Sequence, residues 1–152
     1  ARMVAAVANG GTLYQPYLVD RVAGPGGTPQ IIAGPTVVGN LPVSAAHLAV
    51  IQEAMLGVTT NTEIGTAWHR FAGLDIPVAG KTGTAEPAQK DAVPHSWFAG
   101  YFPADNPEIA MVVLVENAGE GSTVAAPMFR QILEGYNGLP ITPLPTPPAP
   151  AE

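Results

Sequence analysis

The sequence contains no cysteine and has few charged residues. Without cysteine it can form neither a disulfide scaffold nor a zinc–thiolate site. Charged residues make up 12% of the 152 residues, against about a quarter in an average soluble domain. Because 47% of the residues are hydrophobic, we expect other protein to cover much of the surface of this chain.

Basic residues are also scarce. The chain has six lysines and arginines against twelve acidic residues, which gives a net charge of −6 with no basic patch. This composition argues against nucleic-acid binding. No apolar run reaches the roughly 18 residues of a membrane span, and no secretory signal sequence is visible. His47, His69 and His95 lack the spacing of metal ligands, and we expect neither a metal nor another cofactor.

The first residues have a helical pattern. Val4, Val7 and Ala8 share one face, and Asn9-Gly10-Gly11 is a stop signal. No capping residue precedes this helix, and the chain does not begin with methionine. We therefore expect the chain to be a piece of a longer protein that starts inside a helix.

The remaining pattern alternates strands and helices. The predicted elements are a strand over 12–22, a return strand over 30–34, a helix over 44–60, a helical turn near 67–71, strands over 77–87, 96–102 and 108–117, and a helix over 123–135. Three consecutive antiparallel strands flanked by helices define an α+β fold. We expect one domain over 1–138 and a stiff, polyproline-like tail over 139–152, which holds six prolines in 14 residues.

The predicted helices and strands also imply a core. Ser44 is the expected N-cap of the helix over 44–60. The apolar stripe of that helix comprises Leu48, Ile51, Met55 and Val58. In the last helix, the side chains expected to face inward are Met128, Ile132 and Leu133. The apolar run 110–115 indicates a strand covered on both faces.

One predicted strand, "VAGKTGTAEP", is unusually polar. Side chains alternate between the two faces of a strand, so Lys81 shares a face with Gly83, and Thr82 shares the other with Thr84. Gly83 allows a ligand or another backbone to approach closely. The amides of Thr82 and Thr84 point to one edge, where they could bind an extended ligand or an oxyanion. Alternatively, Lys81 is an ordinary surface lysine on an edge strand.

Several segments together resemble a known family. They are "VAAVANGGTLYQPYLV", the triplet Gly65–Ala67, "PVAGKTGTAEP", "HSWFAGYFPADNPEIAMVVLVEN" and "AAPMFRQIL", in that order. Over residues 1–138 the chain resembles the C-terminal part of penicillin-binding proteins, the transpeptidases of bacterial cell-wall synthesis. It looks most like the class B, monofunctional enzymes of elongation and division. Lys-Thr-Gly is one motif of this group, together with S-x-x-K and a serine-containing triplet.

The resemblance implies an acyl-transfer enzyme. In that family the S-x-x-K serine attacks a D-Ala-D-Ala peptide bond, and the amine of another stem peptide resolves the acyl-enzyme. β-Lactams imitate D-Ala-D-Ala and acylate the same serine. By the same resemblance, Lys81 would assist proton transfer with the serine of the second motif. Thr82 and Thr84 would bind the substrate carboxylate, the Thr84 amide would stabilise the oxyanion, and Gly83 would permit close approach.

The resemblance also implies partners and a location. The partners would be the N-terminal remainder of the transpeptidase domain, the stem peptide, β-lactams and a membrane glycosyltransferase. The location would be the extracytoplasmic face of the bacterial cell membrane, with the anchor outside this chain.

The chain lacks the nucleophile of that chemistry. Its serines are Ser44, Ser96 and Ser122, and its lysines are Lys81 and Lys90. These positions form neither S-x-x-K nor S-x-N, so we expect the isolated chain to be inactive. Two alternatives stay open. One is a β-lactam sensor or a non-catalytic scaffold; the other is a serine β-lactamase.

Overall fold

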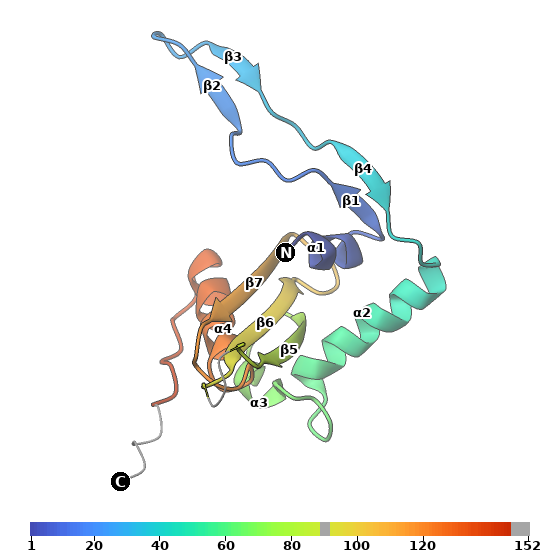
Figure 1. Ribbon diagram of the computed structural model, residues 1–152, viewed down its shortest axis with the longest axis vertical. Coiled ribbons are helices and arrows are strands. Elements are labelled where there is room, and N and C mark those ends of the chain that lie inside the picture. Colours follow the sequence, from blue (N-terminus) through green and yellow to red (C-terminus); the bar gives the residue numbers. More distant parts are fainter. Residues whose placement is uncertain (89–91, 147–152) are drawn as a thin grey trace.

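The computed structural model describes residues 1–88 and 92–146, without the side chains of 29–32. Its elements are α1 (Arg2–Ala8), β1 (Thr12–Tyr14), β2 (Arg21–Ala23), β3 (Pro29–Ile32), β4 (Val37–Asn40), α2 (Ala45–Thr60), α3 (Trp68–Phe71), β5 (Ala79–Ala85), β6 (His95–Phe102), β7 (Ile109–Val115) and α4 (Ala125–Tyr136). A compact body carries a long, thin ribbon made of β1 to β4 (Figure 1). No described helix is both long and apolar enough to cross a membrane.

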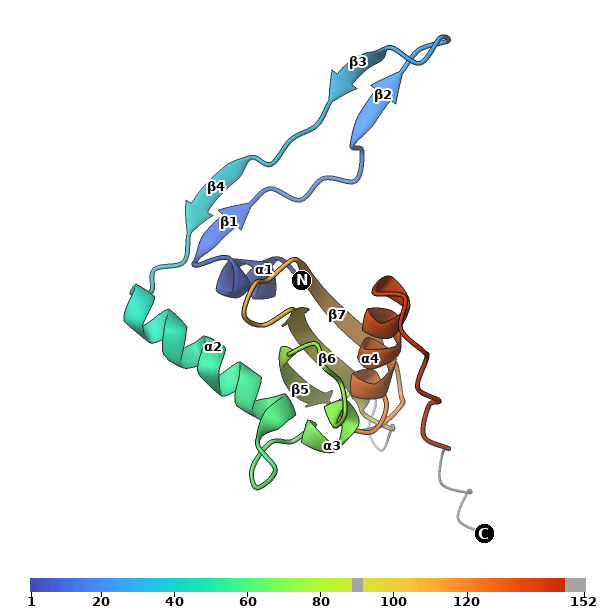
Figure 2. The ribbon, with the colours of Figure 1, turned by 180° about the vertical axis from the view of Figure 1, so that it is seen from behind.

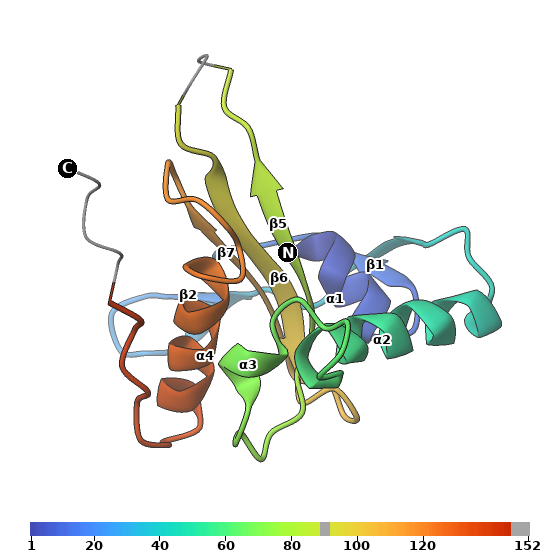
Figure 3. The ribbon, with the colours of Figure 1, turned by 90° about the horizontal axis from the view of Figure 1, so that it is seen from below.

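The body is built on a three-stranded antiparallel sheet. Its order is β5-β6-β7, and Lys81 pairs with Ala99, which pairs with Val112. Helices α1 and α2 lie on one side of the sheet, and α3 and α4 lie on the other (Figure 3). The predicted α+β fold with three consecutive antiparallel strands is therefore confirmed.

The larger core lies between the sheet and α4. Phe129 of α4 is fully buried, and its ring centroid lies 4.8 Å from that of Phe98 on β6. Phe71 of α3 completes this aromatic group, with its ring centroid 5.4 Å from that of Phe98. As predicted, Leu133 is buried and Met128 is partly buried, but Ile132 is 48% exposed. The prediction for Ile132 was wrong because, of these two adjacent residues, it is Leu133 that lies on the sheet side of α4.

A smaller core fills the opposite face of the sheet. Val4 and Val7 of α1 pack against Ala79 of β5, Tyr101 of β6 and Leu48 of α2. Burial raises the pKa of Tyr101, so its phenol stays neutral at ordinary pH. β7 packs against α4 on one face and, near Ala110, against the α1 core on the other, but Leu114 is 44% exposed, so the predicted cover on both faces is only partial.

Helix α2 runs beside the edge of the sheet formed by β5. Its N-cap is Ser44, whose hydroxyl accepts a hydrogen bond from the backbone N–H of His47, as predicted. Near its other end, the buried Thr59 hydroxyl donates to the carbonyl of Val78, just before β5. Helix α2 is thereby joined to the strand that carries the Lys-Thr-Gly sequence. Ile51 was predicted to face the core, but it is 40% exposed.

The N-terminal ribbon differs from the single hairpin that we predicted. The strand expected over 12–22 is split into β1 and β2, and β1 pairs with β4, a strand that the prediction missed. β2 pairs with β3, and the double ribbon projects away from the body (Figure 2). Pro16 lies in the break, where it has no N–H to donate to a ladder.

The segment after α4 folds back along that helix. Residues 139–146 form neither helix nor strand, and the rest of the predicted tail lies outside the described residues. The segment contacts the buried carboxylate of Glu134, which also pairs with Arg130 at 2.6 Å. Burial acts to raise the pKa of Glu134. The hydrogen bonds from Thr142 and the interaction with Arg130 outweigh burial and lower the pKa below its usual value.

Replacing Phe129 by alanine should destabilise the body strongly. Loss of a buried phenylalanine from a packed core typically costs about 3–5 kcal/mol, through lost burial and the cavity left behind. Chemical denaturation would measure the change in the free energy of unfolding. Ile132→Ala, on the exposed side of the same helix, is the control and should cost less than about 1 kcal/mol. Equal losses in the two variants would contradict the assignment of the core.

Candidate functional site

The candidate site is the outer edge of β5. Within the described residues, β5 pairs with β6 alone. The carbonyl of Pro77 points toward β6, because it accepts from the N–H of Ala104, which follows β6. The carbonyl of Val78 points the opposite way, toward Thr59 of α2. Backbone direction alternates along a strand, so the even-numbered residues of β5 present their N–H and C=O groups to the open edge.

This parity places a row of backbone groups at the edge. Gly80, Thr82 and Thr84 direct their amides and carbonyls away from β6. The Thr82 carbonyl accepts a hydrogen bond of 2.7 Å from Nζ of Lys81, as expected for a group that no ladder bond occupies. An extended peptide could pair with such an edge, and the Thr84 amide could donate to an oxyanion.

Lys81 lies on the α1 side of the sheet. It shares that face with Ala79, which belongs to the α1 core, and its own side chain is exposed. The ammonium can therefore reach both the open edge and the space on that side of the sheet. A cation there can bind a carboxylate or take part in proton transfer.

The two threonines of the motif point to the other face. The Thr82 hydroxyl lies 2.8 Å from the hydroxyl of Thr66, and Thr84 is exposed at the end of the strand. Thr66 belongs to a loop after α2 that is held close to that helix, since the N–H of Ala67 donates to the Val58 carbonyl at 3.0 Å. Sequence analysis noted the triplet Gly65–Ala67 but gave Thr66 no role. Only the fold brings its hydroxyl to the strand.

A glycine of the β7–α4 loop supports β5 from behind. A Cβ added at Gly121 would lie 2.6 Å from the carbonyl oxygen of Gly83 and 2.9 Å from its amide nitrogen, and closer still to the carbonyl oxygen of Trp97 on β6. The loop therefore rests directly on the backbone of the Lys-Thr-Gly sequence and of the neighbouring strand. The contact of this loop with Gly83 has no local sequence signal beyond the glycine itself.

Two other residues near the site have structural roles. His95 Nδ1 accepts a hydrogen bond of 3.0 Å from the backbone N–H of Asn117. Trp97 pairs with Gly83 across the ladder, and its Nε1 is buried without an acceptor among the described residues. No group of three potential metal ligands occurs in the described part of the chain.

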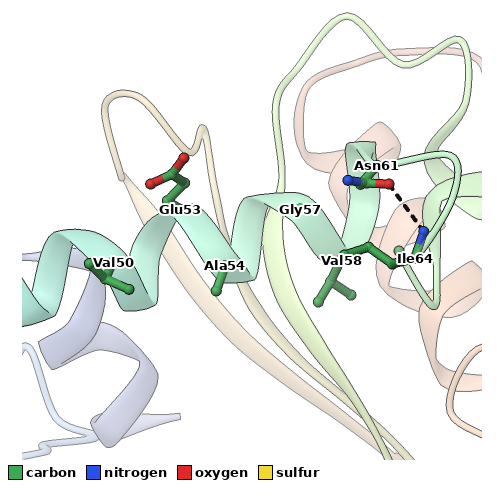
Figure 4. Close-up of a pocket in the computed structure, with 8 residues that line it drawn as sticks. Val50, Glu53, Ala54, Gly57, Val58, Asn61 and Ile64 are labelled. Carbon is green, nitrogen blue, oxygen red and sulfur yellow. Dashed lines mark hydrogen bonds between the residues drawn. The ribbon is translucent and has the colours of Figure 1, made fainter.

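The edge of β5 is an open surface. Two cavities of about 470 and 430 Å³ lie elsewhere, and neither is lined by residues 81–84. The first is a groove along α2, lined by Val50, Gly57 and Ile64 among others (Figure 4). A backbone edge, one exposed lysine and two threonine hydroxyls form one side of a binding site, and the opposite side is not formed by the described residues.

Residues 1–134 match the family model for the penicillin-binding protein transpeptidase domain. The chain belongs to this family. Its relatives include the peptidoglycan D,D-transpeptidase PbpA of Mycobacterium tuberculosis, 33% identical over 144 residues. The peptidoglycan D,D-transpeptidase MrdA of Haemophilus influenzae is 33% identical over 109 residues and matches 62% of this chain and 17% of its own length.

Solved structures show the same fold. The imipenem acyl-enzyme of penicillin-binding protein A from M. tuberculosis superposes with a TM-score of 0.75 at 31% identity, over 90% of this chain and 29% of that one. A D,D-transpeptidase domain from Eggerthella lenta gives a TM-score of 0.73 at 34% identity, over 91% and 32%. These similarities confirm the predicted family and its class B type.

The match covers a limited part of each relative. PbpA aligns with 88% of this chain, but the chain spans only 28% of the length of PbpA. This chain therefore corresponds to only one part of PbpA.

Replacing Gly121 by alanine should disturb the Lys-Thr-Gly strand. The added methyl group would meet backbone atoms of Gly83 that cannot move without shifting β5. Overpacking of this kind typically costs about 1–3 kcal/mol. The matched control is Gly57→Ala, because a Cβ there meets nothing within 4 Å. Alanine should stabilise α2 by about 0.5–1 kcal/mol. Thermal unfolding compares the two, and a neutral Gly121→Ala would contradict the close contact.

Proposed function

We propose that this chain supplies the Lys-Thr-Gly wall of a peptidoglycan D,D-transpeptidase. The nucleophilic serine then lies in a part of the protein outside this sequence. The main support for the proposal is the open edge of β5, which brings the amides of Thr82 and Thr84 together with Lys81 and the threonine hydroxyls. Membership of the transpeptidase family and relatives named as D,D-transpeptidases support it.

In this proposal the donor stem peptide pairs with β5 as an additional strand. Its terminal carboxylate binds to the hydroxyls of Thr82 and Thr84. The serine oxygen attacks the carbonyl carbon of the D-Ala-D-Ala bond, and the negative charge that develops on the carbonyl oxygen is stabilised by the Thr84 amide and the nucleophile's own amide. The absence of a side chain at Gly83 leaves room for the substrate.

Lys81 takes part in proton transfer in this reaction. With the serine of the second motif, it helps to deliver a proton to the nitrogen of the departing D-Ala as the peptide bond breaks. The product is an ester between the serine and the donor peptide. The amine of a second stem peptide then attacks this ester, loses a proton and forms the new cross-link, and the serine oxygen regains its proton.

β-Lactams would use the same surface. Structures of penicillin-binding protein A from M. tuberculosis are acyl-enzyme complexes with imipenem, ceftriaxone and penicillin G. A β-lactam carries a carboxylate next to an acylating carbonyl, so it matches the hydroxyls and amide of β5. We propose that the protein containing this chain is a target of these antibiotics.

The remainder of the transpeptidase domain is the first proposed partner. The outer face of α2 leaves Val50 63% exposed, and the adjoining loop leaves Ile64 81% exposed, along the groove in Figure 4. Contact with further protein would cover these apolar side chains.

The location and the remaining partners follow from the family. We place the protein at the extracytoplasmic face of the bacterial membrane, where stem peptides are cross-linked. A membrane glycosyltransferase that supplies new glycan strands is a further proposed partner. Residues 1–138 form the transpeptidase part, and residues 139–152 form the proline-rich tail.

A transpeptidase differs from the two alternatives in its turnover. A sensor would form a stable acyl adduct and would not turn over a stem-peptide thioester. A β-lactamase would release hydrolysed penicillin rapidly. The D,D-transpeptidase names of the relatives favour the first activity.

Replacing Lys81 by alanine in the complete domain should slow acylation by a β-lactam. General acid–base and electrostatic contributions of this kind are each worth about 10²–10³-fold in rate. Stopped-flow measurement with a fluorescent penicillin gives the rate constant. Arg21→Ala, which removes a positive charge from the distant and exposed ribbon, is the control and should acylate like the wild type. A Lys81→Ala rate within about threefold of the wild-type rate would contradict the role of Lys81.

The isolated 152-residue chain should not be labelled covalently by penicillin. Its three serines occur in neither S-x-x-K nor S-x-N, so it has no activated nucleophile of this family. Gel fluorescence after incubation with a fluorescent penicillin measures the adduct, with the complete domain as the positive control. A labelled band at the mass of the isolated chain would show that the nucleophile lies within these residues.

A further inference from the structure

The segment 139–146 is joined to α4 by hydrogen bonds to the buried side chain of Glu134 and to Gln131. The backbone N–H of Thr142 donates to Oε2 of Glu134, and its hydroxyl donates to Oε1, both at 2.6 Å. Nε2 of Gln131 donates to the Thr142 carbonyl at 2.7 Å. Glu134 is only 2% exposed, and a buried carboxylate is unfavourable unless its oxygens are paired. Thr142 therefore supplies two of the hydrogen bonds that the buried carboxylate of Glu134 needs.

The second partner of Glu134 extends this cluster to α3. Arg130 donates from Nε to Oε1 of Glu134, and its NH1 group donates to the carbonyls of Arg70 and Ala72 at 2.9 and 3.0 Å. These carbonyls lie at the end of α3, where no helical N–H follows to bond them. Glu134 holds the guanidinium in the position from which Arg130 can reach both carbonyls.

Arg70 links this cluster to the β7–α4 loop by a hydrogen bond. Its Nε donates to the carbonyl of Ser122 at 3.0 Å. On the same loop, the carbonyl of Glu120 accepts from the hydroxyl of Ser96 at 3.0 Å, and that hydroxyl accepts from the N–H of Ala125 at 3.1 Å. The loop is therefore held from two sides, by α3 and by β6.

The loop then meets the candidate site. Gly121, between the two anchored carbonyls, lies against the amide and carbonyl of Gly83. A contiguous series of contacts thus runs from Thr142 through Glu134, Arg130 and Arg70 to the strand. Each step is a hydrogen bond or a backbone contact between the described residues.

We propose that the segment 139–146 is a strap that holds the 118–124 loop, and through it the Lys-Thr-Gly strand, in the position that acylation requires. Glu134, Arg130 and Arg70 are its positioning residues. A region so far from the chemistry can matter because a misplacement of reacting groups by 1 Å can cost about 10²-fold in rate. The consequence for acylation rests on the proposed function, whereas the mechanical connection does not.

Two kinds of variant test the strap in the complete protein. Thr142→Val keeps the shape and the backbone N–H of the residue but removes the hydroxyl donor to Glu134, whereas Thr142→Ser keeps the hydroxyl. Truncation after Gly138 removes both donors. Thr28→Val, at an exposed position in the turn of the ribbon, is the control for replacing a threonine by valine.

The first measurement is amide hydrogen exchange without antibiotic. Truncation should speed exchange in the 118–124 loop and in β5 by about tenfold or more, because local opening becomes easier when anchoring contacts are lost. Thr142→Val should give a smaller increase in the same two segments. Thr142→Ser and Thr28→Val should match the wild type, and α1 and the ribbon should be unaffected in every variant.

The second measurement separates initial binding of penicillin from the acylation step. Because the Thr84 amide acts on charge that develops in the transition state, the strap variants should lower the acylation rate constant by about tenfold. Initial binding should change less than about threefold. A general loss of folding would instead reduce the fraction of active protein without changing the rate constant of the remainder, and Thr142→Ser should restore the wild-type value.

The outcomes distinguish the strap from the proposed function. Unchanged exchange in the loop and in β5 after truncation would overturn the strap, even in a protein that penicillin acylates normally. Altered exchange with an unchanged acylation rate constant would overturn its role in positioning the strand. A wild-type protein that penicillin never acylates would overturn the proposed function, and increased exchange in that protein would still support the mechanical connection.

Discussion

Among the described residues, β5 pairs with β6 alone, and the candidate site is built on this one-sided pairing. Because β6 bonds the odd-numbered residues, the amides of Thr82 and Thr84 face the opposite edge, where the Thr82 carbonyl accepts from Nζ of Lys81. An open strand edge is otherwise a site of uncontrolled association. We propose that a ligand adds to this edge as a strand.

Support for the edge comes from both faces of the sheet. On one face, α1 and α2 pack against Ala79 and Tyr101, which leaves Lys81 to continue the same row toward solvent. On the other face, α4 supplies the aromatic core around Phe98 and Phe129. Gly121 adds a backbone contact beneath Gly83, where any side chain would displace the strand. The strand is therefore packed from both faces of the sheet at this point.

The polar cluster around Glu134 connects a distant segment to α4 by hydrogen bonds. A buried carboxylate needs several donors, and here the donors come from α4 itself and from the segment that follows it. The tail is apolar and rich in proline, which offers little secondary structure of its own. Within residues 139–146, Thr142 bonds to both Glu134 and Gln131, and the Leu139 amide donates to the Glu134 carbonyl.

Much of the fold could be predicted because its signals are local. The apolar run of β7, the helical spacing in α4 and the Ser44 cap are short-range patterns, and each predicted the correct element. The ribbon was predicted less well, since Val37 of β4 pairs with Tyr14 of β1, more than twenty residues earlier in the chain. Ile51 and Ile132 were placed in the core on spacing alone, which identifies an apolar stripe but not its borders.

The family and the polar strand could be read from the residues alone, because the order of the motif segments is specific and strand alternation follows from covalent geometry. The same residues show that neither S-x-x-K nor S-x-N occurs among them. The folded chain was needed to show which edge of β5 is unpaired among the described residues, that Thr66 meets Thr82, and that Gly121 rests on Gly83. These are contacts between residues far apart in the chain, and no local pattern encodes them.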